Sequence, residues 1–257
     1  MERIALISDI HGNMPALEAV LLDIKQRGID RIVCLGDLVG KGPEPAETID
    51  RIRETCEVVV QGNWDLGITY KQDNDNGLWQ QSRIGPERLA YLAQLPFAYE
   101  FMLSGKLFRF FHASANSVFH RVKRKASKEE RLAMFSNTDL TNQTCGQKRP
   151  DLIGYADIHV PYLLTLKTAS DNPTELHQGS GLTLFNVGSV GSPYDGNPHS
   201  CYCIVEGSFN SLHPSSYSIQ IVRTPYDIEH SIQLARAAKL PDFDRYMLEI
   251  STGLVHK

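Results

Sequence analysis

The chain has 257 residues, of which 26 are basic and 30 acidic, giving a formal net charge of −4. This balance excludes a global field that would recruit nucleic acid or an anionic membrane surface. The length suits one well-buried α/β core, and we expect a single domain over residues 1–257.

No run of 18 apolar residues occurs, so we expect no transmembrane helix. The first residues lead directly into an apolar run rather than a signal peptide, which predicts a cytoplasmic protein. Five cysteines, an odd number, fit reduced thiols better than a disulfide framework. Cys34 and Cys56 lie in apparent core strands, and Cys201 and Cys203 are expected to be core residues rather than zinc ligands.

The first part of the chain alternates predicted strands and helices. An apolar run at 4–7 predicts a strand, and apolar residues at i, i+3, i+4 and i+7 between 17 and 24 predict an amphipathic helix. A strand at 31–35, a helix from about 45 to 54 and a strand at 56–61 follow. This order predicts right-handed crossovers and a parallel sheet.

The pattern then changes at about residues 65–98 to polar sequence and a helical stripe, which predicts a helical insertion that caps the site. Tyr217, Ile219 and Ile221 alternate with polar residues, as in an antiparallel strand with one wet face. A helix is predicted after residue 225. Together these segments predict two sheets with helices outside both. The later strands are expected at 99–103, 107–111, 162–167, 182–186, 201–205 and 216–223.

Metal-competent side chains follow the apolar runs at the predicted strand ends. In open α/β sheets, functional sites gather outside the carboxyl ends of the strands. Residues two apart in an extended segment project to the same side, so each Asp-x-His pair is predicted to reach one ion. The side chains are Asp9, His11, Asp37, Asn63, His112, Asp157 and His159.

Mixed imidazole and carboxylate donors suit divalent ions such as manganese. Asp37 could bridge two ions about 3.5–4 Å apart, which would acidify a shared water and clamp phosphoryl oxygens. Asn63 offers a carbonyl ligand and an amide donor for a phosphate oxygen. Each residue also has a structural interpretation: Asp9 as a helix cap, Asp37 and Asn63 in Asx turns, His112 as a core histidine. Their conjunction at strand ends favours the metal site.

Five ordered motifs resemble those of calcineurin-like metallophosphoesterases. The resemblance covers about residues 4–205 and is closest to the compact bacterial and archaeal phosphodiesterase branch. It implies an α/β fold, a four-layer αββα sandwich, and hydrolysis of a phosphoester by a metal-bound hydroxide. The motifs are Asp9-Ile10-His11-Gly12-Asn13, Gly36-Asp37, Gly62-Asn63-Trp64-Asp65, Phe111-His112-Ala113-Ser114 and Asn186-Val187-Gly188-Ser189-Val190-Gly191-Ser192-Pro193.

The same resemblance implies two divalent or mixed-valence metal ions, with manganese first and iron or zinc as alternatives. Asp37, Asn63 and His112 are then the catalytic candidates. The implied ligands are Asp9, His11 and His159 for the first ion and Asn63 and His112 for the second, with Asp37 bridging both.

Two positions depart from the family pattern. Asp157 stands where a second-metal histidine is usual, and it adds a third carboxylate beside Asp9 and Asp37. A working site with altered metal preference, a weakly bound second metal and a catalytically reduced protein all stay open. Trp64 stands where many family phosphatases carry a histidine that protonates the leaving group, so good leaving groups should be favoured. Asp65 is expected to orient the ligands from behind, or to cap the next turn.

A basic cluster follows His112, comprising Arg121, Lys123, Arg124, Lys125 and Lys128. It is either a solvated loop or, with Arg124, Lys125 and Asn63, a binding site for substrate phosphates. The leading function is a metal-dependent phosphoesterase for small phosphodiesters or nucleotides, dinucleoside polyphosphates included. The alternatives are a protein serine/threonine phosphatase and a catalytically reduced metal- or nucleotide-binding regulatory protein. We expect no membrane or nucleic-acid partner, and assembly into a homo-oligomer stays open.

Overall fold

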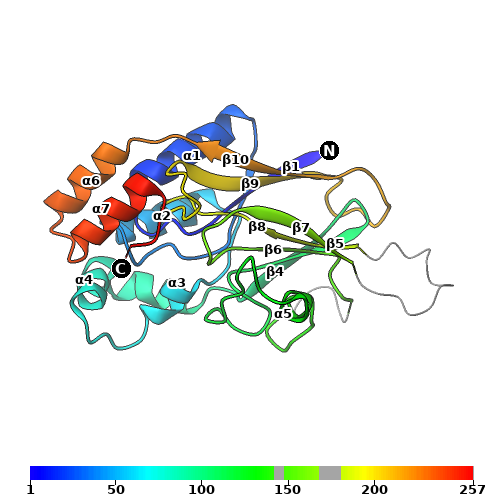
Figure 1. Cartoon of the computed structure of the whole chain (residues 1–257), viewed down its shortest axis with the longest axis horizontal. Coiled ribbons are helices and arrows are strands. Elements are labelled where there is room, and N and C mark those ends of the chain that lie inside the picture. The colour runs from blue at the N-terminus through cyan, green and yellow to red at the C-terminus, as the bar shows by residue number, and fades with distance from the viewer. Residues whose placement is uncertain (142–147, 168–180, 257) are drawn as a thin grey trace.

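Within the described part of the chain, the strands form two five-stranded sheets, and the helices lie outside them (Figure 1). The computed structural model describes residues 1–141, 148–167 and 181–256. In chain order the elements are β1 (Glu2–Ile7), α1 (Met14–Gln26), β2 (Arg31–Cys34), α2 (Pro45–Thr55), β3 (Val58–Val59), α3 (Asn63–Gly67), α4 (Asp75–Ala93), β4 (Ala98–Leu103), β5 (Lys106–Phe111), α5 (Lys128–Ala133), β6 (Leu152–Tyr155), β7 (Tyr162–Lys167), β8 (Gly181–Asn186), β9 (Ser200–Gly207), β10 (Ser218–Thr224), α6 (Ile228–Ala237) and α7 (Phe243–Thr252).

Each sheet mixes parallel and antiparallel strands. The first has the order β10-β9-β1-β2-β3, with β1, β2 and β3 parallel to one another. The second has the order β4-β5-β6-β8-β7, with β5, β6 and β8 parallel. The predicted parallel arrangement of the first three strands is confirmed.

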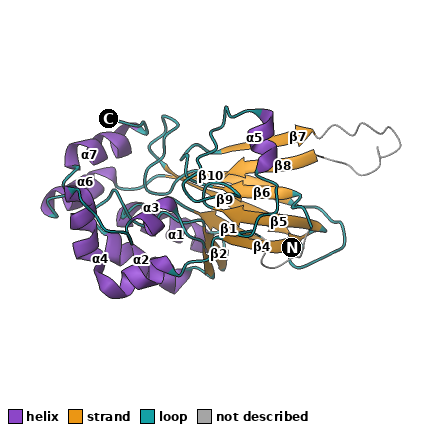
Figure 2. Cartoon of the chain, turned by 90° about the horizontal axis from the view of Figure 1, so that it is seen from below, coloured by secondary structure: helices purple, strands orange, loops and turns teal. Residues whose placement is uncertain are grey.

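Successive side chains of a strand face opposite sides, and β1 therefore contributes to two cores. Ile4 and Leu6 pack with Phe108 between the sheets, whereas Ala5 and Ile7 pack with α1 and α2. A third core covers the outer face of the second sheet below α5. Figure 1 shows α1, the two sheets and α5 in succession, and Figure 2 shows the other helices gathered at one end of the sheets. The predicted four-layer sandwich is confirmed.

The helix α1 begins at an asparagine cap. The Asn13 side chain accepts a hydrogen bond from the backbone N–H of Ala16, and a proline follows in the first turn, where its missing N–H costs nothing. Asn13 is therefore the cap of this helix, and Asp9 is not. The apolar face predicted between residues 17 and 24 is buried against the first sheet.

Several segments differ from their prediction. Within 56–61 only Val58–Val59 pairs as a strand. The strand β10 pairs antiparallel with β9, as predicted, and Ile219 packs against the core between the sheets. Ile221, however, is exposed and Val222 is buried against α1, so the predicted alternation was wrong from Ile221 onward. The helix α4, in the region predicted as an insertion, is kinked at Gly85, where a proline follows. The helix α7 was not predicted.

Two expectations from composition can be compared with the described residues. None of their helices has the length and apolar character needed to cross a membrane. Cys34, Cys56, Cys201 and Cys203 are all free thiols, and Cys203 packs in the core between the sheets, as expected. Cys56 caps the end of α2 and is only partly buried, so the prediction that it lies in a core strand was wrong.

Candidate metal centre

The seven predicted ligand residues all lie where a strand ends. Because the sheets face each other and their parallel strands run side by side, these ends meet in one region. Asp9 and His11 follow β1, Asp37 follows β2, Asn63 begins α3 just after β3, His112 follows β5, and Asp157 and His159 follow β6.

The backbone at five of these residues is left-handed. The φ angles are 51° for Asp9, 52° for His11, 55° for Asp37, 63° for Asp157 and 56° for His159. Residues other than glycine rarely adopt this conformation, and such strain concentrates at functional sites. The two Asp-x-His segments are therefore turned rather than extended, and the extended geometry assumed for them was wrong.

Because of this turned backbone, the side chains of Asp157 and His159 point to different parts of the site. His159 Nε2 lies 3.3 Å from Asp9 Oδ1, whereas Asp157 Oδ1 lies 3.9 Å from His112 Nε2. Asp157 and His159 consequently have different neighbours, and the prediction that both reach one ion is not supported by this geometry. The assignment implied by the family resemblance, in which His159 joins Asp9, agrees with it.

The three site histidines share one orientation. Nδ1 of His11, His112 and His159 lies 2.8, 2.7 and 2.5 Å from the backbone carbonyls of Val39, Leu35 and Ser192, respectively. Each Nδ1–H therefore donates to a carbonyl, which leaves Nε2 facing the site. This arrangement is typical of histidines that bind metal through Nε2.

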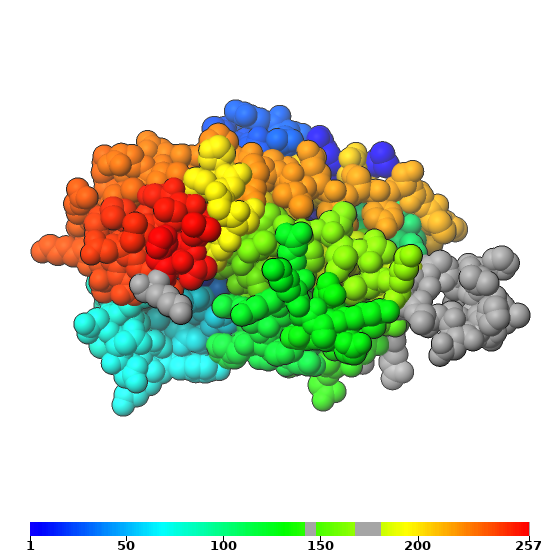
Figure 3. Space-filling view, viewed as in Figure 1, coloured from blue at the N-terminus to red at the C-terminus, as the bar shows by residue number. Residues whose placement is uncertain are grey.

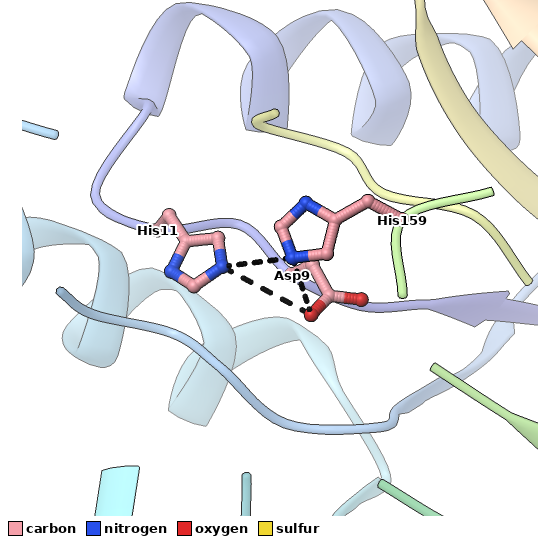
Figure 4. A group of neighbouring side chains, drawn as sticks. All are labelled: Asp9, His11 and His159. Carbon is pink, nitrogen blue, oxygen red and sulfur yellow. Dashed lines mark hydrogen bonds and ion pairs between the residues drawn. The ribbon is translucent and has the colours of Figure 1, made fainter. Parts of the chain in front are cut away.

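Among the residues that the structure describes, two groups of side chains have donor atoms close enough to hold a metal ion. Asp9, His11 and His159 form the first group, which Figure 4 shows converging, and Asp9, Asp37 and His112 form the second. All of these residues are buried. Asp37 Oδ2 lies 3.6 Å from His11 Nε2 and 3.4 Å from His112 Nε2, so its carboxylate stands between the two groups.

Asp9 is the residue that most needs an external partner. Both of its carboxylate oxygens are fully buried, and neither has a hydrogen-bond partner among the described residues. Burial raises the pKa of Asp9, but the charge of His159, His112 and His11 lowers it to about 2. A buried, ionised carboxylate with unsatisfied oxygens fits a bound cation.

His112 and Asn63 complete the second group. The Asn63 amide lies 3.0 Å from His112 Nε2. With its nitrogen turned inward, the amide donates to Asp37 Oδ2 at 3.1 Å and to Asp157 Oδ1 at 3.3 Å. With its oxygen turned inward, it offers a neutral ligand.

Asp65 lies behind this group. Its carboxylate accepts hydrogen bonds from the backbone N–H groups of Asp37, Leu38 and Gly62, at 2.7, 2.9 and 3.0 Å. Burial and the charge of Asp37 raise the pKa of Asp65 to about 7. The residue thus fixes the loop that carries Asp37 and also caps α3, so both interpretations of its role describe part of its contacts.

Asp157 is held by a partner that the sequence did not assign to it. Arg121 Nε and Nη2 donate to its two carboxylate oxygens at 2.9 and 2.8 Å. This bidentate pair raises the pKa of Arg121 and neutralises the third carboxylate of the site.

A basic cavity of about 520 Å³ opens beside the metal groups. Asp157 and His159 form part of its wall, and so do the two predicted substrate-binding residues Arg124 and Lys125. Asn63, the third predicted substrate-binding residue, lines a neighbouring cavity. The basic side chains around the first cavity are Lys41, Arg121, Lys123, Arg124, Lys125 and Arg245. Their charge suits an anionic ligand.

Four residues of this region were missed at the level of sequence. Tyr194 stacks on the His159 ring with centroids 4.5 Å apart, and its hydroxyl donates to Glu249. Lys41 also contacts Glu249, with a 3.3 Å separation, and Arg245 pairs with the same carboxylate at 3.0 Å. The i, i+4 spacing of Arg245 and Glu249 was the available signal. Figure 3 shows the C-terminal segment packed against the segment that follows Tyr194.

Comparison with known proteins identifies the class. The profile of the calcineurin-like phosphoesterase superfamily domain matches residues 2–208. The chain therefore belongs to this superfamily, and it is a metallophosphoesterase, a metal-dependent phosphoric ester hydrolase of the compact bacterial and archaeal kind.

Three relatives illustrate the relationship. An uncharacterised protein of Methanocaldococcus jannaschii is 33% identical over 254 residues, which cover 93% of this chain and 94% of the relative. The phosphodiesterase YfcE of Escherichia coli is 36% identical over 101 residues, or 35% of this chain and 55% of that protein. The crystal structure of a metallophosphoesterase from Sphaerobacter thermophilus is 25% identical, with a TM-score of 0.74 over 98% of this chain and all of that one.

Proposed function

We propose that this chain hydrolyses small phosphodiesters or nucleotides with two metal ions, manganese being the first choice and iron or zinc the alternatives. The observation that best supports this proposal is that two buried groups of potential metal ligands share Asp9 and lie beside a basic cavity. The first ion would be held by Asp9, His11 and His159, and the second by Asn63 and His112, with Asp37 between them. Asp157 is proposed as a further ligand of the second ion.

Bound ions at these positions would lower the pKa of a water and neutralise phosphoryl oxygens. The chain itself supplies the remaining functions. Asn63 can donate an amide hydrogen bond to a phosphoryl oxygen, and Arg124 and Lys125 attract the negatively charged ester. The indole of Trp64 cannot act as a general acid and protonate the leaving group. Esters with good leaving groups should therefore react fastest.

Turnover of bis(4-nitrophenyl) phosphate after manganese addition tests this proposal. Asp37→Asn should reduce kcat/KM by at least about 100-fold, because it removes the charge between the two ligand groups. The control is Asp30→Asn, which changes an exposed aspartate just before β2, at the opposite end of that strand from Asp37, and should retain the parent rate. Failure of the parent protein to hydrolyse the diester under these conditions would contradict the proposal. Faster hydrolysis of a phosphoserine peptide would favour the alternative of a protein phosphatase.

One observation favours the second candidate, a metal- or nucleotide-binding protein with reduced turnover. The Arg121 pair occupies both oxygens of Asp157. A second ion would have to compete with this guanidinium, so the second site could fill only at high metal concentration. The amount of bound metal and the rate of diester hydrolysis should be measured on the same samples. A low rate at low metal content indicates weak binding of the second ion, whereas a low rate at full metal content indicates reduced catalysis.

A further inference from the structure

A second cavity, of about 390 Å³, adjoins the ligand group on the side of the helical segment α3–α4. Carboxamides make up much of its lining, and none of the described residues around it is cationic, in contrast to the basic cavity. Its volume lies within the range of about 300–1,000 Å³ that small-molecule sites occupy. The residues that matter here are Asn63, Trp64, Asn76, Gln80 and Asp242.

Two of these carboxamides have oxygens without partners. Gln80 is fully buried, and its Nε2 donates to the Gly42 carbonyl at 3.2 Å. Asn76 Nδ2 donates to the Gly40 carbonyl at 3.2 Å. Gln80 Oε1 and Asn76 Oδ1 are both buried and accept no hydrogen bond from the described residues. An orphaned buried acceptor costs free energy, so both oxygens are suited to a ligand that carries N–H donors.

Trp64 connects the two cavities, because its side chain lines both. A Cβ on Gly40 would lie 2.4 Å from the indole ring, so the absence of a side chain there allows the ring to pack against the backbone. The ring also meets His11 edge-on, at a centroid distance of 5.9 Å. Trp64 is thus a fixed aromatic wall next to the metal groups, and such a surface favours a flat apolar ring.

We propose that this amide cavity, defined by Asn63, Trp64, Asn76, Gln80 and Asp242, binds the base of a nucleotide substrate, specifically a base with an exocyclic amino group. The amino group donates to Gln80 Oε1 and Asn76 Oδ1, and the ring lies against Trp64. The Asp242 carboxylate repels phosphate from this cavity, so the anionic part of the substrate is directed toward the basic one. This inference rests on the proposed function, since it names the substrate class of the same site.

The test compares two substrates that differ only in the amino group. They are the 5′-(4-nitrophenyl phosphate) esters of adenosine and of purine riboside. The parent protein should favour the adenosine ester by about 10-fold in kcat/KM, because the purine ester leaves buried acceptors unpaired. Equal values would overturn the inference.

The variant Gln80→Met keeps the size of the side chain and removes the acceptor, and it should reduce this preference to less than about 3-fold. The matched control is Gln81→Met, on the same helix, whose amide donates to the carbonyls of Ile68 and Tyr70 and does not line the cavity. It should retain the preference. If Gln80→Met does not fold, Asn76→Ala replaces it. Full preference in the folded variant would contradict the assignment of that acceptor.

Binding provides a measurement that does not depend on turnover. Calorimetric titration with adenosine monophosphate and with purine riboside monophosphate should show the same discrimination in Kd. If the parent discriminates in binding but hydrolyses neither these esters nor bis(4-nitrophenyl) phosphate, the proposed function fails and the cavity assignment stands. If it hydrolyses the diester but shows no discrimination, only the cavity assignment fails.

Discussion

His112 lies among three carboxylates, and its charge must change when a metal ion binds. Burial lowers the pKa of His112, but the charges of Asp37, Asp9 and Asp157 raise it to about 10. Only the neutral imidazole can act as a ligand. Metal uptake below pH 10 therefore has to displace the proton that His112 carries in the metal-free protein.

We predict that manganese loading at pH 8 releases about one proton more from the parent than from His112→Asn. Calorimetry in two buffers of different ionisation enthalpy measures this number. Equal proton release in the two proteins would show that His112 is not the protonated ligand.

The same pKa predicts how the stability of the metal-free protein depends on pH. An unfolded imidazole titrates near about 6.5, well below the folded value. The charged His112 therefore stabilises the fold fully below about pH 6.5, and this contribution is lost as the pH rises toward 10. The urea midpoint should fall more between pH 7 and 10 in the parent than in His112→Asn.

Arg121 competes with metal for Asp157, although its own side chain is about half exposed. Arg121→Met removes the two hydrogen bonds that a metal ion would have to displace from Asp157, so affinity for a second manganese ion should rise by roughly 10-fold. Asp157→Ala should lower this affinity. Titration with manganese, with Lys123→Met as the control for lost surface charge, measures both effects. Weaker binding by Arg121→Met would show that the guanidinium holds Asp157 in place instead of competing for it. Unchanged binding by Asp157→Ala would remove Asp157 from the ligands.

At the scale of elements, α7 supports the site through Glu249, which is almost fully buried. Glu249→Ala removes the acceptor of the Tyr194 hydroxyl and leaves Lys41 with that hydroxyl as its acceptor, and should lower the free energy of unfolding by about 2 kcal/mol. Arg245→Ala removes only the exposed partner of the same carboxylate, and should cost less than about 1 kcal/mol. Urea unfolding of the metal-free variants compares them. A reversed order would mean that the buried contacts contribute little.

The turn after β8 is a second supporting element. The backbone N–H groups of Val190 and Gly191 donate to the carbonyls of Ser8 and Asp9 at 2.9 and 3.0 Å. A Cβ on Gly191 would lie 1.8 Å from the Ile10 carbonyl oxygen. Gly191→Ala should thus lower the free energy of unfolding by about 2 kcal/mol or more and weaken manganese binding.

Gly67→Ala is the matched control for this substitution, because a Cβ there meets nothing within 4 Å. In the helix α3 the added methyl group should be neutral or stabilise by up to about 1 kcal/mol. Similar urea midpoints for the two alanine variants would show that the close approach at Gly191 relaxes at little cost.

For the molecule as a whole, periodicity and strand-end residues predicted the two sheets, the flanking helices and the meeting of the ligand residues. Contacts over long separations were not predictable in this way. Five basic residues lie close together in the sequence, and Arg121 is the one that forms the bidentate pair with Asp157. Which of the five does so depends on how their loop folds over β6. Likewise, the left-handed turns that separate Asp157 from His159 follow from packing, which local spacing does not encode.

The amide cavity shows the same limit. Gln80 lies on α4, a helix whose polar sequence made it hard to recognise. Its amide nitrogen donates to the Gly42 carbonyl in the loop after β2, and this hydrogen bond leaves the amide oxygen of the same side chain without a partner. The α7 contacts join the end of the chain to residues near its beginning, such as Lys41. In each case the sequence gives the residue type, and only the folded backbone gives the partner.

The contact of Ser189 with the Asp9 carbonyl joins residues 180 positions apart in the chain. During synthesis, the segment containing Asp9 leaves the ribosome long before its partner exists. A nascent polypeptide therefore lacks the complete set of candidate metal ligands until most of its length has emerged, and metal capture becomes a late step of maturation. Retained metal would then serve as a readout of full-length, correctly closed molecules in a preparation.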